Sequence, residues 1–255
     1  MKHYCVFLKK EIIESIRTKK LLIVLLVFAL LGILNPLTAK ITPDIIKNLA
    51  PGGQQIQLPD PSAMDSLEQF FKNTKQMGLI VFLITFSGIL TTEISNGSLI
   101  NVLTKGLARK SVILAKYTLM GLLWSLSISI SFAITWLYTV NLFPKVEINH
   151  LLFSIFCIWL FGLYLLTLLL FASVLTNSNY GNLLVLGIVT VISVILNISE
   201  KAQKYNPLTL SAKNMELIRG TIKPSYLYTS VGITILLIIV LMLLSIILFN
   251  KKQVN

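Results

Sequence analysis

The charged side chains that separate two apolar stretches are the residues of this sequence best placed to do chemistry. Residues 93–116 lie between a charge-free stretch at 76–92 and another at 117–144. The segment contains one acid and four bases: Glu93, Lys105, Arg109, Lys110 and Lys116. Such groups form ion pairs with another protein or with lipid phosphate. The pattern therefore predicts a binding segment between two membrane spans.

Motifs for catalysis are absent from the sequence. It contains no HExxH or GxSxG motif and no pair of carboxylates within an apolar stretch, so it offers nothing for an intramembrane hydrolase to use. It also contains no GxxxxGK[ST] loop to hold ATP phosphates. Cys5 lies far from Cys157, and His3 far from His150, in the topology predicted below, so no disulfide and no metal site is expected.

The distribution of charge indicates the fold class. Hydrophobic residues make up 55% of the chain and charged residues 13%, against roughly 25% charged residues in soluble domains. The 52 residues from 148 to 199 contain no Lys, Arg, Asp or Glu. Since about 20 apolar residues cross the hydrocarbon, this stretch predicts two crossings and a turn. We predict an all-α membrane protein with six transmembrane helices, at residues 21–39, 77–92, 117–140, 151–175, 182–198 and 226–249.

Several functional classes conflict with this pattern. The net charge of +12 does not indicate a nucleic-acid partner, because the basic residues flank apolar spans and form no aromatic-interleaved face. The six predicted spans contain no ionisable group, which argues against a proton- or sodium-coupled carrier. No ring of charges indicates a selective channel.

The segments outside the spans have their own patterns. Residues 1–20 predict an interfacial helix with an apolar stripe of Tyr4, Leu8, Ile12 and Ile16, although a solvated basic leader is the alternative. Residues 40–76 and 199–225 are predicted as external loops, and residues 250–255 as a cytoplasmic tail. The first loop is expected to end in a short helix at 65–75, and the second to be helix-like at 208–219. Asn35-Pro36 lies near the outer end of the first span, where a helix can break at little cost.

Six spans place both termini on one side of the membrane. Six Lys or Arg precede the first span, whereas only Lys40 and Lys47 follow it closely. Because the positive-inside rule gives most weight to the flanks of the first span, both termini and residues 93–116 are predicted to be cytoplasmic.

The third span carries a stripe of small hydroxyl residues. Ser127, Ser131 and Thr135 recur at intervals of four residues and share one helix face. Such a stripe allows close helix packing in lipid, and the alternative is a polar face along a substrate path.

With this arrangement of spans, residues 93–116 resemble the cytoplasmic connection between spans two and three of ABC-2 type transporter permeases. The family pattern is an acid leaving span two, a Gly one turn later, a Leu-containing helix, a small residue with Arg, and a Lys entering span three. The matching residues are Glu93, Gly97, Leu99 or Leu103, Gly106, Arg109 and Lys116. The sequence departs from the pattern at 105–108, where many relatives have Pro or Ser before the Arg. The order of the other segments is also similar, so the resemblance covers essentially the whole chain and implies a type V exporter-like transmembrane domain.

The resemblance implies a half-transporter. Two permease chains, identical or different, would each bind a cytoplasmic ABC ATPase subunit that holds ATP and magnesium, while this chain itself would hold no cofactor. The implied ATPase-coupling residues are Ile12, Ile16, Arg17, Glu93, Gly97, Leu99, Leu103, Lys105, Gly106, Arg109 and Lys116. Glu93 would form a stiffening salt bridge with Arg109, Lys116 or Arg17, or would be a solvated helix-end carboxylate. The basic side chains, Arg109 included, would pair with acids on the ATPase, and for Arg109 lipid phosphate is the alternative.

By similarity to small bacterial permeases for bacteriocin immunity, bacitracin resistance and toxic-peptide export, including phenol-soluble-modulin exporters, the expected function is the export of amphipathic peptides or lipophilic antibiotics across the plasma membrane. A lipid or polysaccharide exporter, and a non-transporting sensor or scaffold that recruits an ATPase, are the alternatives.

Overall fold

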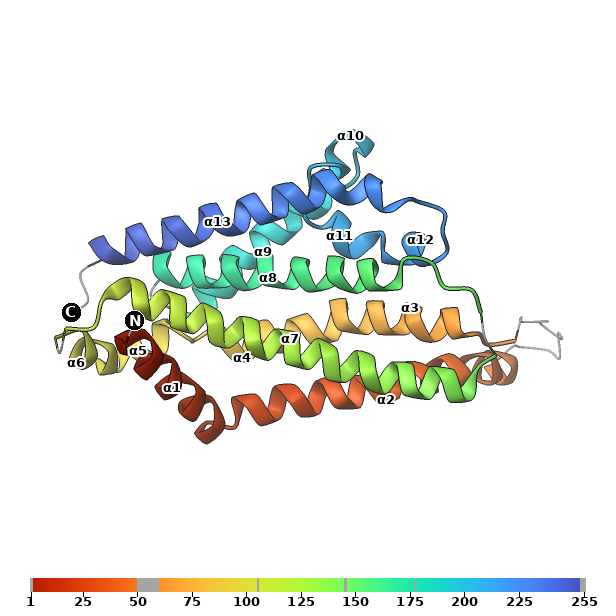
Figure 1. Ribbon diagram of the computed structural model, residues 1–255, viewed down its shortest axis with the longest axis horizontal. Coiled ribbons are helices and arrows are strands. Elements are labelled where there is room, and N and C mark those ends of the chain that lie inside the picture. Colours follow the sequence, from red (N-terminus) through yellow and green to blue (C-terminus); the bar gives the residue numbers. More distant parts are fainter. Residues whose placement is uncertain (1, 50–59, 105, 145, 177, 253–255) are drawn as a thin grey trace.

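The computed structural model describes residues 2–49, 60–104, 106–144, 146–176 and 178–252, and these residues form helices and loops only (Figure 1). Six of the helical segments are long and apolar enough to cross a membrane: Lys20–Ile46, Ala63–Ser95, Arg109–Leu142, Leu151–Leu175, Asn179–Leu196 and Pro224–Lys251. The predicted all-α fold with six spanning helices is confirmed.

The helices follow one another in the order α1 (Lys2–Arg17), α2 (Lys20–Leu49), α3 (Ala63–Asn73), η2 (Thr74–Gly78), α4 (Leu79–Phe86), α5 (Thr91–Ser95), α6 (Ser98–Thr104), α7 (Arg109–Leu142), α8 (Leu151–Leu175), α9 (Asn179–Leu196), α10 (Glu200–Gln203), α11 (Thr209–Ala212), α12 (Asn214–Ile218), η3 (Pro224–Leu227) and α13 (Tyr228–Lys251).

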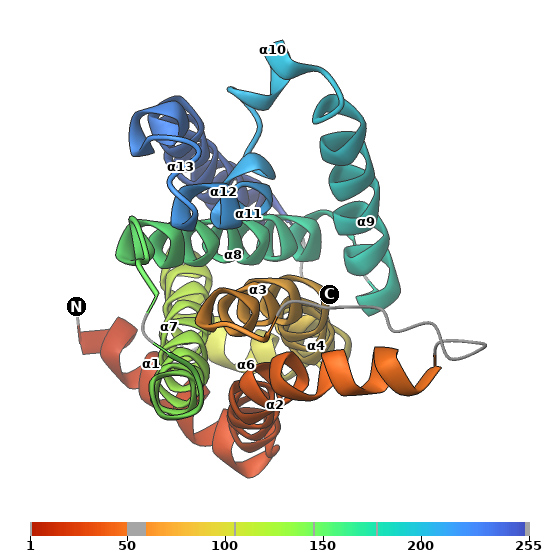
Figure 2. The ribbon, with the colours of Figure 1, turned by 90° about the vertical axis from the view of Figure 1, so that its right-hand side faces the viewer.

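The bundle is arranged around α8. Of the six spanning helical segments, Leu151–Leu175 is the most deeply buried, whereas Asn179–Leu196 and Pro224–Lys251 are the least buried. α7 packs along α2 and α1, while α13 and α9 pack on α8 from the other side (Figures 1 and 2). α9 stands apart from α13 in Figure 2, so most of its surface needs lipid or another protein to cover it.

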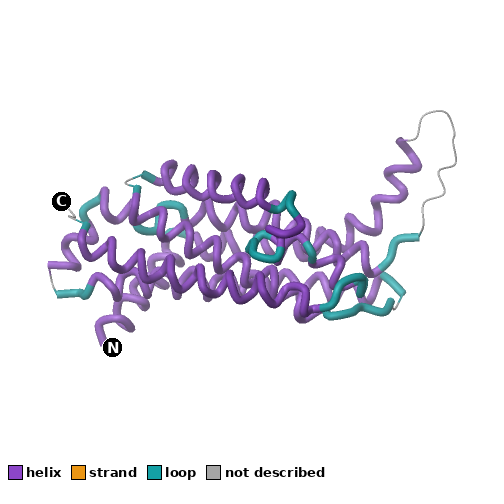
Figure 3. The backbone as a smooth tube through the Cα atoms, turned by 90° about the horizontal axis from the view of Figure 1, so that it is seen from above, coloured by secondary structure: helices purple, strands orange, loops and turns teal. Residues whose placement is uncertain are grey.

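The first span differs from the expected one. Pro36 does not end the helix near residue 39, because α2 continues through Pro36 and Pro43 to Leu49. Proline within a helix removes a backbone hydrogen bond and bends the helix. Accordingly, the outer part of α2 turns away from the bundle (Figure 3).

The second span also begins earlier than the predicted residue 77. α3 runs into α4 through η2, a π-helical turn, so the short helix expected at 65–75 is continuous with the span and not a separate loop element. A π-turn inserts one extra residue per turn and is tolerated where neighbours pack against it. Here Gly78 lies under the Phe28 ring, since a Cβ at this position would be 2.8 Å from Phe28 Cζ.

Trp124 lies at the centre of the core, between α2, α4 and α8. Its ring makes edge contacts with Phe28 and Phe82 at centroid distances of 5.7 and 5.6 Å, and its Nε1 donates to the Trp159 carbonyl at 3.0 Å. Gly162 makes room for the indole, because a Cβ there would be 2.2 Å from Trp124 Cε2. This close approach fixes the distance between α7 and α8.

We therefore expect Gly162→Ala to lower the free energy of unfolding by about 1–3 kcal/mol, the usual cost of overpacking a core. Thermal unfolding of the purified chain in detergent measures the loss. Gly187→Ala on α9 is the matched control, since a Cβ at Gly187 meets nothing within 4 Å. Equal stability of the two variants would show that the indole is not held this tightly.

Candidate functional site

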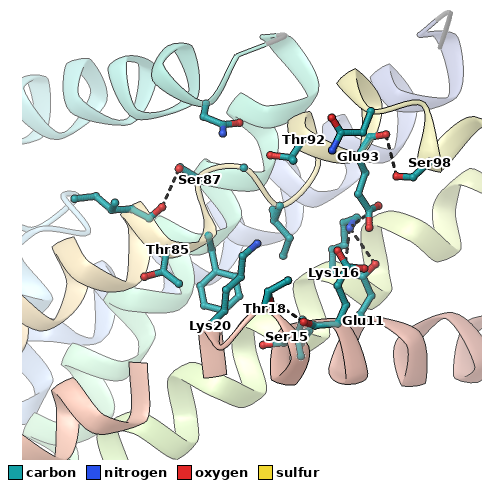
Figure 4. A pocket seen from close by; sticks show the side chains of 18 residues that line it. Glu11, Ser15, Thr18, Lys20, Thr85, Ser87, Thr92, Glu93, Ser98 and Lys116 are labelled. Atoms are coloured by element: carbon teal, nitrogen blue, oxygen red, sulfur yellow. Dashed lines mark hydrogen bonds and ion pairs between the residues drawn. The ribbon is translucent and has the colours of Figure 1, made fainter. Parts of the chain in front are cut away.

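A buried lysine joins three helices at the end of the bundle that carries both chain ends. Lys116 on α7 places its Nζ 3.0 and 3.1 Å from the two carboxylate oxygens of Glu11 on α1 (Figure 4). The same Nζ lies 2.9 Å from Oε2 of Glu93 on α5, at a distance typical of an ion pair. The exposed fractions of the Lys116, Glu11 and Glu93 side chains are 1%, 4% and 9%.

The position of Glu11 depends on the face that α1 turns toward α7. Phe7, Glu11 and Ser15 follow one another at intervals of four residues and are buried. Tyr4 adds a hydrogen bond from its hydroxyl to Thr118 Oγ1 at 2.9 Å. α1 is thus a packed helix and not the solvated leader considered as an alternative.

The apolar stripe expected on α1 is not the face that lies deepest. Tyr4, Leu8 and Ile12 are half-buried and border the core, but Ile16 is 55% exposed. The buried face of α1 differs from the predicted one because a carboxylate at position 11 can be buried when a lysine from another helix neutralises it. A pattern of apolar residues contains no sign of that partner.

Lys10 completes the charge cluster from its rim. It contacts Glu93 and also Glu14 and Glu11, while 42% of its side chain remains exposed. Burial alone would lower the pKa of Lys10, but hydrogen bonds to Glu14 and Glu93 raise this pKa above the ordinary lysine value. Burial and the charge of Glu93 hold the pKa of Glu11 above the usual value of a glutamate, although Lys116 and Lys10 act to lower this pKa.

The three carboxylates of Glu11, Glu14 and Glu93 lie close enough together to suggest a metal site. The ammonium groups of Lys10 and Lys116 already lie among them and supply the positive charge. The arrangement is accordingly that of an ion-pair cluster.

The connection after Glu93 turns twice at glycines. Gly97 between α5 and α6 has a φ of +67° and Gly106 before α7 has a φ of +88°, conformations that favour glycine. Leu99 is 1% exposed and belongs to the core of this chain, so it does not present an apolar edge to a partner. Leu103 is half-buried beside it, and Lys105 lies outside the described residues.

Arg109 and Lys252 hold helix ends at this side of the bundle. The Nη1 of Arg109 donates to the carbonyls of Phe249, Asn250 and Lys252, the first at 2.8 Å, and so caps α13. Lys252 Nζ in turn donates to the carbonyls of Val174 and Thr176 at the end of α8. Basic groups at helix C-termini satisfy free carbonyls and complement the helix dipole.

These contacts decide between the partners considered for Glu93. Among the ion pairs of the described residues, Glu93 binds Lys116 and Lys10, and neither Arg17 nor Arg109 is its partner. Arg17 is exposed at the end of α1, and Lys19 just after it has a φ of +59° that turns the chain into α2.

A cavity of about 480 Å³ opens beside the ion cluster (Figure 4). α1 and α5 line it together with the turn at 87–90 and the start of α9. Its polar lining residues include Glu14, Thr18, Lys20, Asn96, Ser98 and Asn179.

Amides on α9 fix the break between α4 and α5. The sequence pattern does not predict these contacts. Asn182 Nδ2 donates to the Ser87 carbonyl at 2.6 Å, and Thr91 Oγ1 donates to Asn179. Gly88 permits the approach, because a Cβ there would be 2.8 Å from Asn179 Nδ2. The only sequence signal is a turn, residues 176–181, that is rich in Asn and Ser but has no charge.

The hydroxyl stripe of α7 lies between helices. Ser127, Ser131 and Thr135 are fully buried, and Thr135 Oγ1 donates to the Gly32 carbonyl on α2 at 3.1 Å. A Cβ at Gly32 would be 2.9 Å from the Ser131 carbonyl. The stripe thus serves close packing of α2 on α7 and does not border an open surface of this chain.

Comparison with protein families identifies the family of the chain. A family model described as ABC-2 family transporter protein matches residues 5–254. No curated protein matches the chain.

Replacing Lys116 tests the cluster. We expect Lys116→Met to lower the free energy of unfolding by about 3–5 kcal/mol, because it leaves buried carboxylates without their counter-charge. Adding Glu11→Gln should recover part of the loss, and exposed Lys110→Met is the matched control on the same helix. Thermal unfolding in detergent gives the double-mutant cycle, and strictly additive losses would contradict the coupling.

Replacing Arg109 tests the helix caps. Without the guanidinium, the last carbonyls of α13 lose their donor, so Arg109→Gln should speed amide hydrogen exchange at residues 249–252 by about fivefold, as expected for about 1 kcal/mol per hydrogen bond. The neighbouring exposed Lys110→Gln should leave the exchange unchanged. Equal exchange in both variants would show that Arg109 does not hold this end.

Proposed function

The chain belongs to the ABC-2 transporter family, and from this premise we propose that it is the permease of an exporter whose ATP hydrolysis takes place in a separate ATPase subunit. Family membership and the six spanning helices make it a multi-pass membrane permease component of an ABC transporter. The proposal adds the direction, the separate ATPase and the surface that couples the two proteins.

The observation that carries the proposal is the buried ion cluster. Lys116 ties α1 and α5 to the start of a 34-residue helix that runs through the whole bundle. Separating these groups would leave buried charges without partners, which costs several kcal/mol. A force applied to α1 or α5 is therefore passed to α7 instead of bending the connection.

The surface around this cluster is suited to a protein partner. Ile13 and Ile16 on α1 are 40% and 55% exposed, and the same helix carries the cavity-lining residues Glu14 and Ser15. Exposed apolar side chains rimmed by polar groups are typical of protein interfaces. We place the ATPase against this face of α1 and the mouth of the cavity. Its ATP and magnesium would stay within the ATPase.

The residues implied by the family resemblance divide into two groups in this proposal. Ile16 and Arg17 are exposed and would contact the ATPase. Glu93 and Lys116 are buried, as is Leu99, so these residues would act by holding the connection rigid, with Gly97 and Gly106 shaping its turns. Ile12, Leu103 and Arg109 lie between these extremes.

The complete transporter in this proposal has two permease chains, identical or different, in a bacterial plasma membrane with both termini in the cytoplasm. α9 and α13, the least buried of the spanning helices, leave room for a second chain. The substrates would be amphipathic peptides or lipophilic antibiotics, which can reach the permease from the inner leaflet.

An ATPase-binding experiment tests the proposal. The permease is co-expressed with each candidate ABC ATPase subunit of its own genome, and the complex is purified in detergent. Ile16→Glu should reduce the recovered ATPase about tenfold or more, since charge at the core of an interface commonly costs at least 1–2 kcal/mol. Leu152→Glu, an 80% exposed position on the opposite end of the bundle, is the control. Undiminished recovery with Ile16→Glu would remove this face of α1 from the interface.

A further inference from the structure

The segment that follows α9 carries an excess of positive charge. Residues 199–224 contain five bases and two acids: Lys201, Lys204, Lys213, Arg219, Lys223, Glu200 and Glu216. In the predicted topology this segment is outside, where Lys and Arg are normally depleted. Basic residues retained there need a counter-charge.

Two of the five bases form ion pairs with acids of this chain. Lys213 Nζ lies 2.6 Å from Glu216, and Arg219 Nη2 lies 2.9 Å from Glu68. The ion pairs of the described residues include none for Lys201, Lys204 or Lys223, and of these three Lys201 and Lys204 lie together at α10. Both lysines are exposed, on α10 and directly after it.

The surroundings of the two lysines are apolar and aromatic. Ile198 is 80% exposed and Tyr205 is 62% exposed, one on each side of α10. α10 projects sideways from the bundle, beyond the end of α9 (Figures 1 and 2). α10 follows directly on α9, a helix long and apolar enough to cross a membrane, so the end of that span places α10 near the lipid headgroups.

Hydrogen bonds hold this projecting segment in place. Asn206 Nδ2 donates to the Ser193 carbonyl at 2.6 Å, and Thr209 Oγ1 donates to Asn197 Oδ1 at 2.9 Å. Ser230 on α13 donates to the Lys204 carbonyl at 3.0 Å. The backbone beneath the lysines is thus fixed by α9 and α13, which lowers the entropic cost of binding a ligand.

We propose that Lys201, Lys204, Tyr205 and Ile198 form a binding site for an anionic phospholipid. The two ammonium groups bind the headgroup phosphate, Tyr205 lies at the boundary between headgroup and acyl chain, and Ile198 contacts the chain. This site is at the opposite end of the bundle from the ion cluster and does not depend on the ATPase.

Lipid titration followed by native mass spectrometry tests the site. The full chain is purified in a non-ionic detergent and titrated with dioctanoyl phosphatidylglycerol. We expect Lys201→Gln combined with Lys204→Gln to weaken binding about thirtyfold, given a gain of about fivefold per lysine at an anionic surface. Lys40→Gln combined with Lys72→Gln removes the same charge from exposed positions on other helices and should leave binding unchanged.

Three results would overturn the proposal. They are unchanged binding in the Lys201 and Lys204 double variant, equal binding of dioctanoyl phosphatidylcholine, and equal binding of glycerol 3-phosphate, which would indicate a site for soluble phosphate. Thermal unfolding of each variant verifies its fold. If the double variant does not fold, Lys204→Gln alone should weaken binding about fivefold, and Lys204→Arg should restore it.

Discussion

The arrangement of this bundle end depends on one buried ammonium group. Lys116 is 1% exposed, and it is acceptable at that position only because Glu11 and Glu93 approach it from two other helices. The desolvation cost of such a cluster is high, so its members are strongly coupled. A surface ion pair would yield to small forces, whereas this cluster makes α1, α5 and the start of α7 behave as one unit. The cavity beside it and the exposed isoleucines of α1 give that unit a surface for a partner.

The two ends of the bundle are held together by different kinds of side chain. At the end that carries the termini, Arg109 and Lys252 link the carbonyl ends of α13 and α8 to α7 and to each other. At the other end, the excursion after α9 is held mainly by amides and hydroxyls, among them Asn197 and Asn206. Neutral groups leave the lysines of α10 available to a ligand.

Much of the fold could be predicted from the sequence, because lipid requires long apolar helices and those are visible as charge-free stretches. The fourth span was predicted at 151–175, the bounds of α8. The predicted helix boundaries were wrong where the count of apolar residues ignored the continuity of a helix. Pro36 bends α2 without ending it, and the polar helix α3 continues into the second span. Of the candidate site, Glu93 and Lys116 were identified by their resemblance to a family pattern. Glu11 was missed, since its burial depends on a lysine distant in sequence, and Leu99, implied as an ATPase-coupling residue, is buried within the chain.

The rigid unit formed by α1, α5 and α7 is the central claim, and a spin-label distance measurement tests it most directly. Labels at Lys9→Cys and Lys110→Cys, with Cys5→Ser to remove the exposed native thiol, report the separation of α1 from the start of α7. In the complex with its ATPase, pulsed electron paramagnetic resonance should give one narrow distance that is the same without nucleotide and in the ATP-trapped state. A distance that shifts or broadens on trapping ATP would show that α1 moves independently of α7, and would contradict the account.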